Sequence, residues 1–306
     1  MKNNQSQIKV QLILPQEKIS FEEKLKGFWQ LVRADKPIGI LLLLWPSLWA
    51  LWIAGNGNPD WYVMLVFILA SLLVRSAGCA INDFADRRID TRVSRTCMRP
   101  IATGIIRPKE ALSVFAVLIV AALLLVMTLN LKTILLSLVA VFLALVYPYM
   151  KRYTHLPQVV LGLAFAWTVP LAYSALEVEF EPVTWVLFAI TLLWVLTYDT
   201  EYAIVDRDDD IRIGVKSTAI LFADWDVYFI GFFQLLTVLM FLLVGELADR
   251  SWLYFVGILL SSLFFIRQQY LMHLDKKSGA YAAFLNNNCF GLSVFLILIV
   301  DYVLTV

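Results

Sequence analysis

Long apolar stretches, each close to the length of a membrane-spanning helix, dominate this chain of 306 residues. An α-helix needs roughly 20 mostly apolar residues to cross the hydrocarbon core of a bilayer. Within that core every backbone polar group must be hydrogen-bonded inside the protein, which a helix achieves by itself. We therefore predict an all-α integral membrane protein with nine transmembrane helices. They are expected at about 38–55, 61–81, 111–129, 131–150, 157–175, 183–203, 227–247, 251–270 and 284–304.

The overall composition agrees with a membrane protein and argues against other classes. Hydrophobic residues make up 60% of the chain and charged residues 16%, against about 45–50% and about 25% in soluble domains. The net charge of +1 provides no field that would attract nucleic acid. The cysteines Cys79, Cys97 and Cys289 lack the spacing of a metal site, so we interpret them as ordinary small apolar residues.

The distribution of basic residues predicts the orientation in the membrane. If the N-terminus is cytoplasmic, 22 of the 25 Lys and Arg residues fall in cytoplasmic segments, with only Lys132 and Arg250 outside and Arg75 within a span. Because cytoplasmic loops are enriched in Lys and Arg, we predict an N-in, C-out protein. Residues 1–37 would form a cytoplasmic N-terminal segment with an interfacial helix, and 38–306 one transmembrane domain.

Two acidic clusters follow spans that end on the predicted cytoplasmic side. The first, "INDFADRRID" (81–90), spaces Asn82, Asp86 and Asp90 four residues apart. The second, "YDTEYAIVDRDDD" (198–210), contains Asp199, Asp206 and Asp210 at intervals of seven and four. Residues at these intervals share one face of a helix, so each span is expected to continue as a helix that presents a column of oxygen ligands.

A divalent cation would explain why carboxylates gather beside an apolar membrane, since like charges at this spacing repel. Oxygen ligands without His or Cys favour Mg²⁺ or Ca²⁺, and Mg²⁺ is usually held by one or two carboxylates together with substrate phosphates. We predict a magnesium–diphosphate site with two walls. Asp83 could bind the metal or lie behind its ligands, and Asp208 and Asp209 are expected to be solvated. The predicted metal ligands are Asn82, Asp83, Asp86, Asp90, Asp206 and Asp210.

Basic residues near the acidic clusters could bind anions. Arg75 lies within a span, where an unpaired charge is costly. It could pair with an aspartate, or it could hold a substrate carboxylate through two parallel hydrogen bonds. After the fourth span, Lys151 and Arg152 could serve as cytoplasmic anchors or bind a diphosphate. Arg95 and Arg99, in the loop after the second span, could reach a leaving diphosphate as that loop closes over the site.

The two clusters together resemble a known family. "NDFADRRID" matches the NDxxDxxxD pattern of the UbiA superfamily of membrane prenyltransferases, and "YDTEYAIVDRDDD" is similar to its second aspartate-rich motif. The segments "RADKPIGILLLLWPSLWAL" (33–51), "VYPYMKRYTHLPQVVLG" (146–162) and "DRDDDIRIGVKSTAILF" (206–222) resemble the members that use 4-hydroxybenzoate. The resemblance extends from about residue 25 to the C-terminus.

The resemblance implies nine transmembrane helices around a central cavity with both motifs at its cytoplasmic mouth. It implies Mg²⁺ as cofactor, polyprenyl diphosphate as donor and 4-hydroxybenzoate as acceptor, in ubiquinone biosynthesis. Membrane lipid is the other expected partner, with no nucleic acid and no obligate protein partner. By motif position the implied catalytic residues are Asp86, Asp90, Asp206, Asp210 and Arg75. The implied substrate-binding residues are Arg75, Tyr147, Lys151 and Arg152, to which the residue patterns above add Arg95 and Asp199.

One local departure and two alternatives accompany this interpretation. Ala203 stands where a four-residue ladder from Asp199 would place a carboxylate, so the second wall is expected to use mainly Asp206 and Asp210. The same fold could serve a haem-, menaquinone- or homogentisate-directed prenyltransferase, and intramembrane acids also occur in cation transporters. Because no Arg-rich transit peptide precedes residue 25, we expect a bacterial inner membrane with the site facing the cytoplasm.

Overall fold

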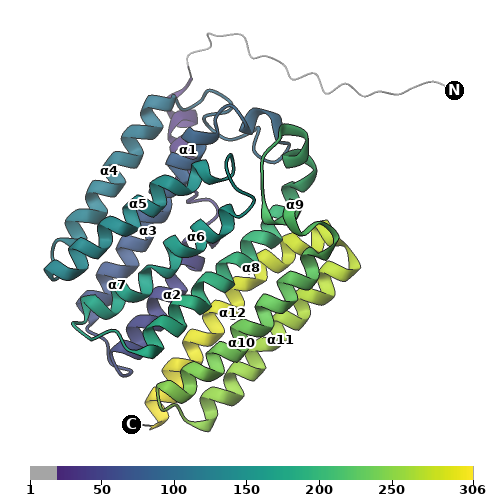
Figure 1. Ribbon diagram of the computed structural model, residues 1–306. Helices are drawn as coiled ribbons and strands as arrows, with labels where there is room; N and C mark the ends of the chain where they lie inside the picture. Colours follow the sequence, from purple (N-terminus) through teal and green to yellow (C-terminus); the bar gives the residue numbers. More distant parts are fainter. Residues whose placement is uncertain (1–18, 306) are drawn as a thin grey trace.

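The computed structural model describes residues 19–305, and its regular structure is entirely helical, as predicted (Figure 1). The first half contains α1 (Phe21–Leu31), α2 (Ile38–Ala54), α3 (Trp61–Asp86), η1 (Asp90–Arg92), α4 (Pro108–Val126), α5 (Leu131–Met150), α6 (Pro157–Ala166) and α7 (Thr168–Ala175). The second half contains α8 (Pro182–Ile213), α9 (Thr218–Phe222), η2 (Ala223–Trp225), α10 (Asp226–Leu247), α11 (Trp252–Leu274) and α12 (Lys276–Thr305).

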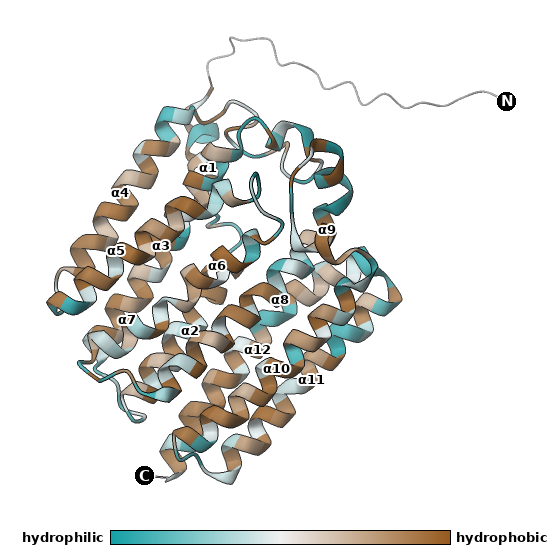
Figure 2. Ribbon diagram, viewed as in Figure 1, coloured by the Kyte–Doolittle hydropathy of each residue, from teal (hydrophilic) through white to brown (hydrophobic). Residues whose placement is uncertain are grey.

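The described residues contain eight helical segments long and apolar enough to cross a membrane, with α6–α7 and α9–α10 each counted as one. The apolar helix α2, at 17 residues, is only slightly shorter. Together these segments correspond in order to the nine predicted stretches. Hydrophobic residues run along the helices and hydrophilic residues gather mostly near their ends, as expected for a bundle in lipid (Figure 2).

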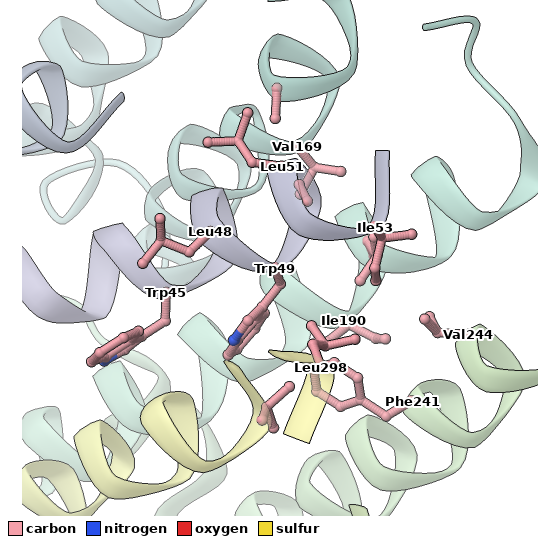
Figure 3. Close-up of a cluster of buried hydrophobic side chains, with 14 of the residues drawn as sticks. Trp45, Leu48, Trp49, Leu51, Ile53, Val169, Ile190, Phe241, Val244 and Leu298 are labelled. Atoms are coloured by element: carbon pink, nitrogen blue, oxygen red, sulfur yellow. The ribbon is translucent and has the colours of Figure 1, made fainter. Parts of the chain in front are cut away.

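Aromatic residues pack the core where α2, α8, α10 and α12 meet (Figure 3). The Trp49 ring lies 5.1 Å from that of Trp194 and 5.3 Å from that of Phe241, measured between centroids. Both indole N–H groups are satisfied: Trp49 donates to the Gly291 carbonyl at 3.1 Å and Trp194 to Asn287 Oδ1 at 2.8 Å. Buried aromatic residues with paired polar atoms make this side of the bundle a rigid support for α8.

Several helices extend beyond the predicted spans. α3 continues to Asp86, α8 to Ile213, and α12 begins at Lys276 rather than near 284. Hydropathy marks the apolar part of a helix, whereas backbone hydrogen bonding continues through polar turns. Gly214, with φ of +72°, ends α8 in a left-handed conformation that residues with a Cβ atom rarely adopt.

The predicted interfacial helix is present as α1. Ser20 accepts a hydrogen bond from the Glu23 N–H, and the Glu23 side chain accepts one from the Ser20 N–H. Leu31 is buried, whereas the large side chains of Phe21, Leu25 and Trp29 are exposed along one ridge. The rest of the predicted segment 1–37 lies partly outside the described residues, and the placement of α1 at a membrane surface stays a prediction.

Candidate active site

Both acidic motifs line one cavity of about 1140 Å³. The side chains of α3 and η1 form one wall, and those of α8 form the other. The two motifs therefore border the same cavity, which their resemblance to the family implied. The predicted site residues that line this cavity are Arg75, Asn82, Asp83, Asp86, Asp90, Arg95, Tyr147, Lys151, Asp199, Asp206 and Asp210.

The first wall departs from the predicted helical column. α3 ends at Asp86, so Asp90 lies on the separate 3₁₀ turn η1 rather than one turn further along α3. The chain leaves the α-helix here because the following loop folds back, and Arg99 NH1 reaches Asp90 Oδ2 and Asp83 Oδ1, both at 3.0 Å. Burial raises the pKa of Asp90 above its ordinary value, and the Arg99 guanidinium opposes that shift.

Asp83 anchors two arginines. Besides Arg99, it accepts two hydrogen bonds from Arg33 NH2, at 2.8 and 3.0 Å. Arg33 also lines the cavity and has φ of +58°, an uncommon conformation for a residue other than glycine. Sequence reasoning missed Arg33, although "RADKP" places a basic residue directly before the first span. The sequence left two roles open for Asp83, binding the metal or lying behind its ligands. In the structure its carboxylate binds the guanidinium groups of Arg33 and Arg99.

The second wall forms one uninterrupted face of α8, as predicted. Arg95 from the loop after η1 donates through Nε to Asp206 Oδ1 at 2.8 Å, and through NH1 to the Tyr202 hydroxyl at 2.5 Å. Tyr202 was missed in the sequence, although it lies four residues before Asp206 and so shares its helical face. Ala203 also lines the cavity, four residues after Asp199, where a carboxylate would continue the row of acidic residues along α8.

Lys151 and Arg152, at the end of α5, take different positions. Lys151 lines the cavity and forms an ion pair with Asp86. Arg152 is absent from the described lining, and its NH2 group donates to the Ala85 carbonyl at 2.7 Å. The Lys216 N–H donates to the Lys151 carbonyl at 3.0 Å and so holds the loop after α8 against α5. Arg152 therefore binds the end of α3 rather than lining the cavity.

Arg75 projects into the cavity without an acidic partner among residues 19–305. Its Nε donates to the Gly39 carbonyl at 3.2 Å, and NH1 lies 3.5 Å from Cys79 Sγ. A Cβ atom on Gly39 would lie 2.8 Å from the guanidinium, so glycine is needed for this close approach. The sequence left open whether Arg75 pairs with an aspartate or binds a substrate carboxylate. In the described residues Arg75 forms no ion pair with an aspartate.

Several oxygen atoms that line the cavity could bind a metal, because no basic side chain of the described residues is bonded to them. In the described part of the chain, the side chains of Asn82, Asp199 and Asp210 form no hydrogen bond or ion pair, and Asp86 Oδ1 is buried without a partner. Residues 19–305 contain no preformed group of three His, Cys, Asp or Glu side chains that could hold a metal. Dispersed carboxylate and amide oxygens fit Mg²⁺, which takes few protein ligands when phosphates supply others.

Comparisons with known proteins agree with this geometry. Residues 43–299 match the UbiA prenyltransferase family. A 4-hydroxybenzoate octaprenyltransferase of Aliivibrio fischeri is 51% identical over 273 residues, which cover 89% of this chain and 96% of the relative. A UbiA homologue from Aeropyrum pernix K1 has a similar structure, with a TM-score of 0.76 and 25% identity over 86% of this chain and 97% of that one.

A more distant structure is relevant to ligands. A UbiA homologue from Archaeoglobus fulgidus, solved with GPP and Mg²⁺ bound, shares the fold with a TM-score of 0.65 and 18% identity. The match covers 89% of this chain and 99% of that chain. At this identity the likeness concerns the fold alone, and the bound ligands are properties of the homologue.

Proposed function

Because this chain belongs to the UbiA prenyltransferase family, we propose that it transfers a polyprenyl group from polyprenyl diphosphate to 4-hydroxybenzoate. The new bond forms at the ring carbon ortho to the hydroxyl, which gives a precursor of ubiquinone. Relatives that are about half identical over some nine-tenths of the chain carry the name 4-hydroxybenzoate octaprenyltransferase. The observation that carries the proposal is Arg75, a guanidinium without an acidic partner in the described chain, in the same cavity as two acidic motifs.

Donor binding uses the mouth of the cavity, where the carboxylates of both walls converge. Asn82, Asp86, Asp90, Asp206 and Asp210 would hold Mg²⁺, directly or through water. When bound, Mg²⁺ neutralises charge on the diphosphate oxygens and so favours departure of this group. Asp83, already bound by Arg33 and Arg99, positions these arginines near the metal ligands.

The basic side chains stabilise the diphosphate as it leaves. Lys151, Arg95 and Arg99 are paired with Asp86, Asp206 and Asp90 respectively. Each cation could bind a diphosphate oxygen in place of part of its contact with the carboxylate. Preorganised cations at the position where negative charge develops lower the barrier without a large reorganisation of solvent.

Arg75 positions the acceptor by binding its carboxylate, so that the ortho carbon faces the allylic carbon of the donor. The allylic carbon–oxygen bond of the donor breaks, a carbon–carbon bond to the ring forms, and a ring proton leaves to restore aromaticity. Asp199, which lines the cavity and has no ion pair in the described chain, can accept that proton. The apolar walls exclude water, which would otherwise capture the allylic cation.

The charge distribution also supports a location and an orientation. We place the protein in the inner membrane of a bacterium, with its N-terminus and the acidic mouth in the cytoplasm and its C-terminus outside. The segments that would then be cytoplasmic hold 22 of the 25 Lys and Arg residues. A mouth at the membrane edge lets the diphosphate stay near water while the prenyl tail stays in an apolar environment.

The test uses purified protein in detergent with 4-hydroxybenzoate, a polyprenyl diphosphate and Mg²⁺. We expect release of diphosphate and formation of the 3-prenylated acid, identified by mass spectrometry. Phenol, which lacks the carboxylate, and homogentisate serve as comparison acceptors, and equal rates with all three would contradict the assigned acceptor. Full activity of the double variant Asp86→Ala, Asp206→Ala would contradict the assignment of the α3 and α8 carboxylates to binding of Mg²⁺ and diphosphate. Uptake of Mg²⁺ into proteoliposomes without prenyl transfer would favour a transporter instead.

A further inference from the structure

Residues 93–97, directly after η1, form a turn with Arg95 in its middle, which we call the Arg95 turn. The Cys97 N–H donates to the Val93 carbonyl at 2.9 Å, and the Cys97 thiol donates to the Ser94 carbonyl at 3.3 Å. Val93 is buried, whereas Arg95 lines the cavity. The turn is therefore closed by its own hydrogen bonds and presents one cation to the site.

Three residues of α8 hold the Arg95 turn from one side. Tyr202, Asp206 and Asp209 follow one another at intervals of four and three, so they share a face of the helix. Asp206 forms an ion pair with the Arg95 guanidinium, and the Tyr202 hydroxyl accepts a hydrogen bond from Arg95 NH1 at 2.5 Å. Asp209 Oδ2 accepts one from the Ser94 N–H at 3.1 Å, which fixes the backbone next to Arg95.

Asp209 differs from its neighbour Asp208, although both were expected to be solvated. The Asp208 side chain is 68% exposed and pairs with Lys277 at 3.4 Å. The Asp209 side chain is only 19% exposed and faces the Arg95 turn, so the expectation was wrong for this residue. Arg212 lies 3.7 Å from Asp209, but it is mostly exposed, and such surface pairs contribute little. The main partner of Asp209 is thus the backbone of the turn.

Tyr202 is held in place from behind. Its ring packs against Phe284 of α12, with 4.7 Å between the centroids, and both residues line the cavity. Arg95 Cζ lies 4.5 Å from the centroid of the Tyr202 ring, within the range of a cation–π interaction. The ring and the hydroxyl of one tyrosine therefore restrict the same guanidinium.

We propose that Asp209 and Tyr202 are positioning residues for donor binding. Asp209 fixes the backbone of the Arg95 turn, and Tyr202 fixes the guanidinium. The inference deepens the proposed function and rests on it, since it takes Arg95 as a ligand of the diphosphate. Asp206 is itself a proposed metal ligand, so contacts that do not depend on Asp206 are needed to keep Arg95 at the mouth. A cation held in this way needs little reorganisation to meet the charge of the departing diphosphate.

Steady-state kinetics of Asp209→Ala and Tyr202→Phe test the two contacts. Each substitution removes one hydrogen bond to the Arg95 turn, so the KM for polyprenyl diphosphate is expected to rise about three- to tenfold, with the KM for 4-hydroxybenzoate unchanged. Asp209→Asn keeps an oxygen that can accept from the Ser94 N–H and should bring the donor KM back toward that of the unaltered enzyme. Asp208→Ala is the matched control and should leave both KM values unchanged.

Double variants separate positioning from a general structural effect. In an Arg95→Ala background, neither Asp209→Ala nor Tyr202→Phe should raise the donor KM further, because both residues act through Arg95. Increases that multiply with that of Arg95→Ala would show that Asp209 and Tyr202 act independently of Arg95, which would overturn the inference. An equal rise of both KM values in the single variants would also overturn it.

The Cys97 thiol supplies a readout that does not depend on turnover, because its hydrogen bond lies within the Arg95 turn. Mass spectrometry of the Cys97 peptide measures the rate at which this thiol is alkylated in the intact protein in detergent. The rate should rise about threefold or more in Asp209→Ala, where the turn opens more often, and stay unchanged in Asp209→Asn and Asp208→Ala.

The outcomes distinguish this inference from the proposed function. An unchanged Cys97 rate or an unchanged donor KM in Asp209→Ala would overturn the role of Asp209, although prenyl transfer itself stands. An unchanged donor KM in Tyr202→Phe would do the same for Tyr202. Absence of transfer by the unaltered enzyme would instead overturn the proposed function, and the inference with it.

Discussion

Arg95, in the loop after η1, donates a hydrogen bond to Asp206, in the C-terminal third of α8, with Nε 2.8 Å from Oδ1. This contact joins segments that are 111 residues apart and brings the loop of the first motif over the second. Burial by itself would lower the pKa of Arg95, but the hydrogen bond and charge of Asp206 raise it above the ordinary value, so the guanidinium keeps its charge. The two motifs are thereby joined through one guanidinium group.

Removing one carboxylate from either wall should strongly reduce prenyl transfer. Asp206→Asn and Asp86→Asn keep the side-chain shape but lose the charge that balances the cations and metal. We expect kcat to fall by about 10²–10³, similar to the loss of other preorganised charge-stabilising groups. Asp208→Asn is the matched control, because Asp208 is exposed on the same helix and pairs only with Lys277 at 3.4 Å in the described chain. Comparable losses in all three variants would contradict the assignment.

Replacing Arg75 should affect the acceptor far more than the donor. A charge-assisted hydrogen bond contributes about 1.5–3 kcal/mol, so Arg75→Leu should raise the KM for 4-hydroxybenzoate about 10- to 100-fold. Arg75→Lys keeps the charge but not the paired geometry, and we expect an intermediate value. Steady-state kinetics with each substrate varied in turn provides the measurement. Equal increases in both KM values would assign Arg75 to the diphosphate.

Chelation should remove activity by weakening donor binding. Treatment with EDTA is expected to abolish prenyl transfer, and added Mg²⁺ should restore it, because carboxylates and diphosphate repel each other unless a cation lies between them. Calorimetry with inorganic diphosphate supplies a readout that does not depend on turnover: binding should require Mg²⁺. Tight binding of diphosphate in EDTA would show that the basic side chains suffice.

Asp83→Asn distinguishes the two predicted roles of this residue. If Asp83 holds Arg33 and Arg99, the variant should raise the KM for polyprenyl diphosphate and leave the Mg²⁺ concentration for half-maximal activity unchanged. Asp90→Asn, at a predicted metal ligand on the same wall, is the comparison and should raise that concentration. A rise of similar size in Asp83→Asn would indicate that Asp83 binds the metal.

Glu201 should contribute to stability rather than to chemistry. It is fully buried on α8 and accepts hydrogen bonds from Asn287 Nδ2 at 2.7 Å and Gln234 Nε2 at 3.4 Å, which join α8 to α12 and α10. Glu201→Ala removes the acceptor of one N–H of each amide, while the bonds to the Ala283 carbonyl and to Gln268 Oε1 remain, and an unsatisfied buried donor costs about 1–3 kcal/mol. Thermal unfolding in detergent should therefore occur at a lower temperature in Glu201→Ala than in the near-isosteric Glu201→Gln. Loss of activity at unchanged stability would show a direct role.

The sequence alone predicted the helical membrane architecture, and most of the residues that it proposed for the site line one cavity. Apolar stretches of bilayer length require helices, and the four-residue spacing on α8 placed Asp206 and Asp210 on one face, as found. Such local rules depend only on neighbours along the chain. Tyr202 obeys the same rule and could have been identified with them.

Only the tertiary structure decided which charges meet. Asp90 lies on η1 rather than on α3, Asp83 binds Arg33 and Arg99, Arg152 lies outside the described lining, and Arg75 faces the cavity without an acidic partner in the described chain. Each outcome depends on how a loop folds back or how two helices pack, and side-chain spacing carries no information on either. The carboxylates near the membrane edge were visible in the sequence, whereas their partners come from segments up to 111 residues away.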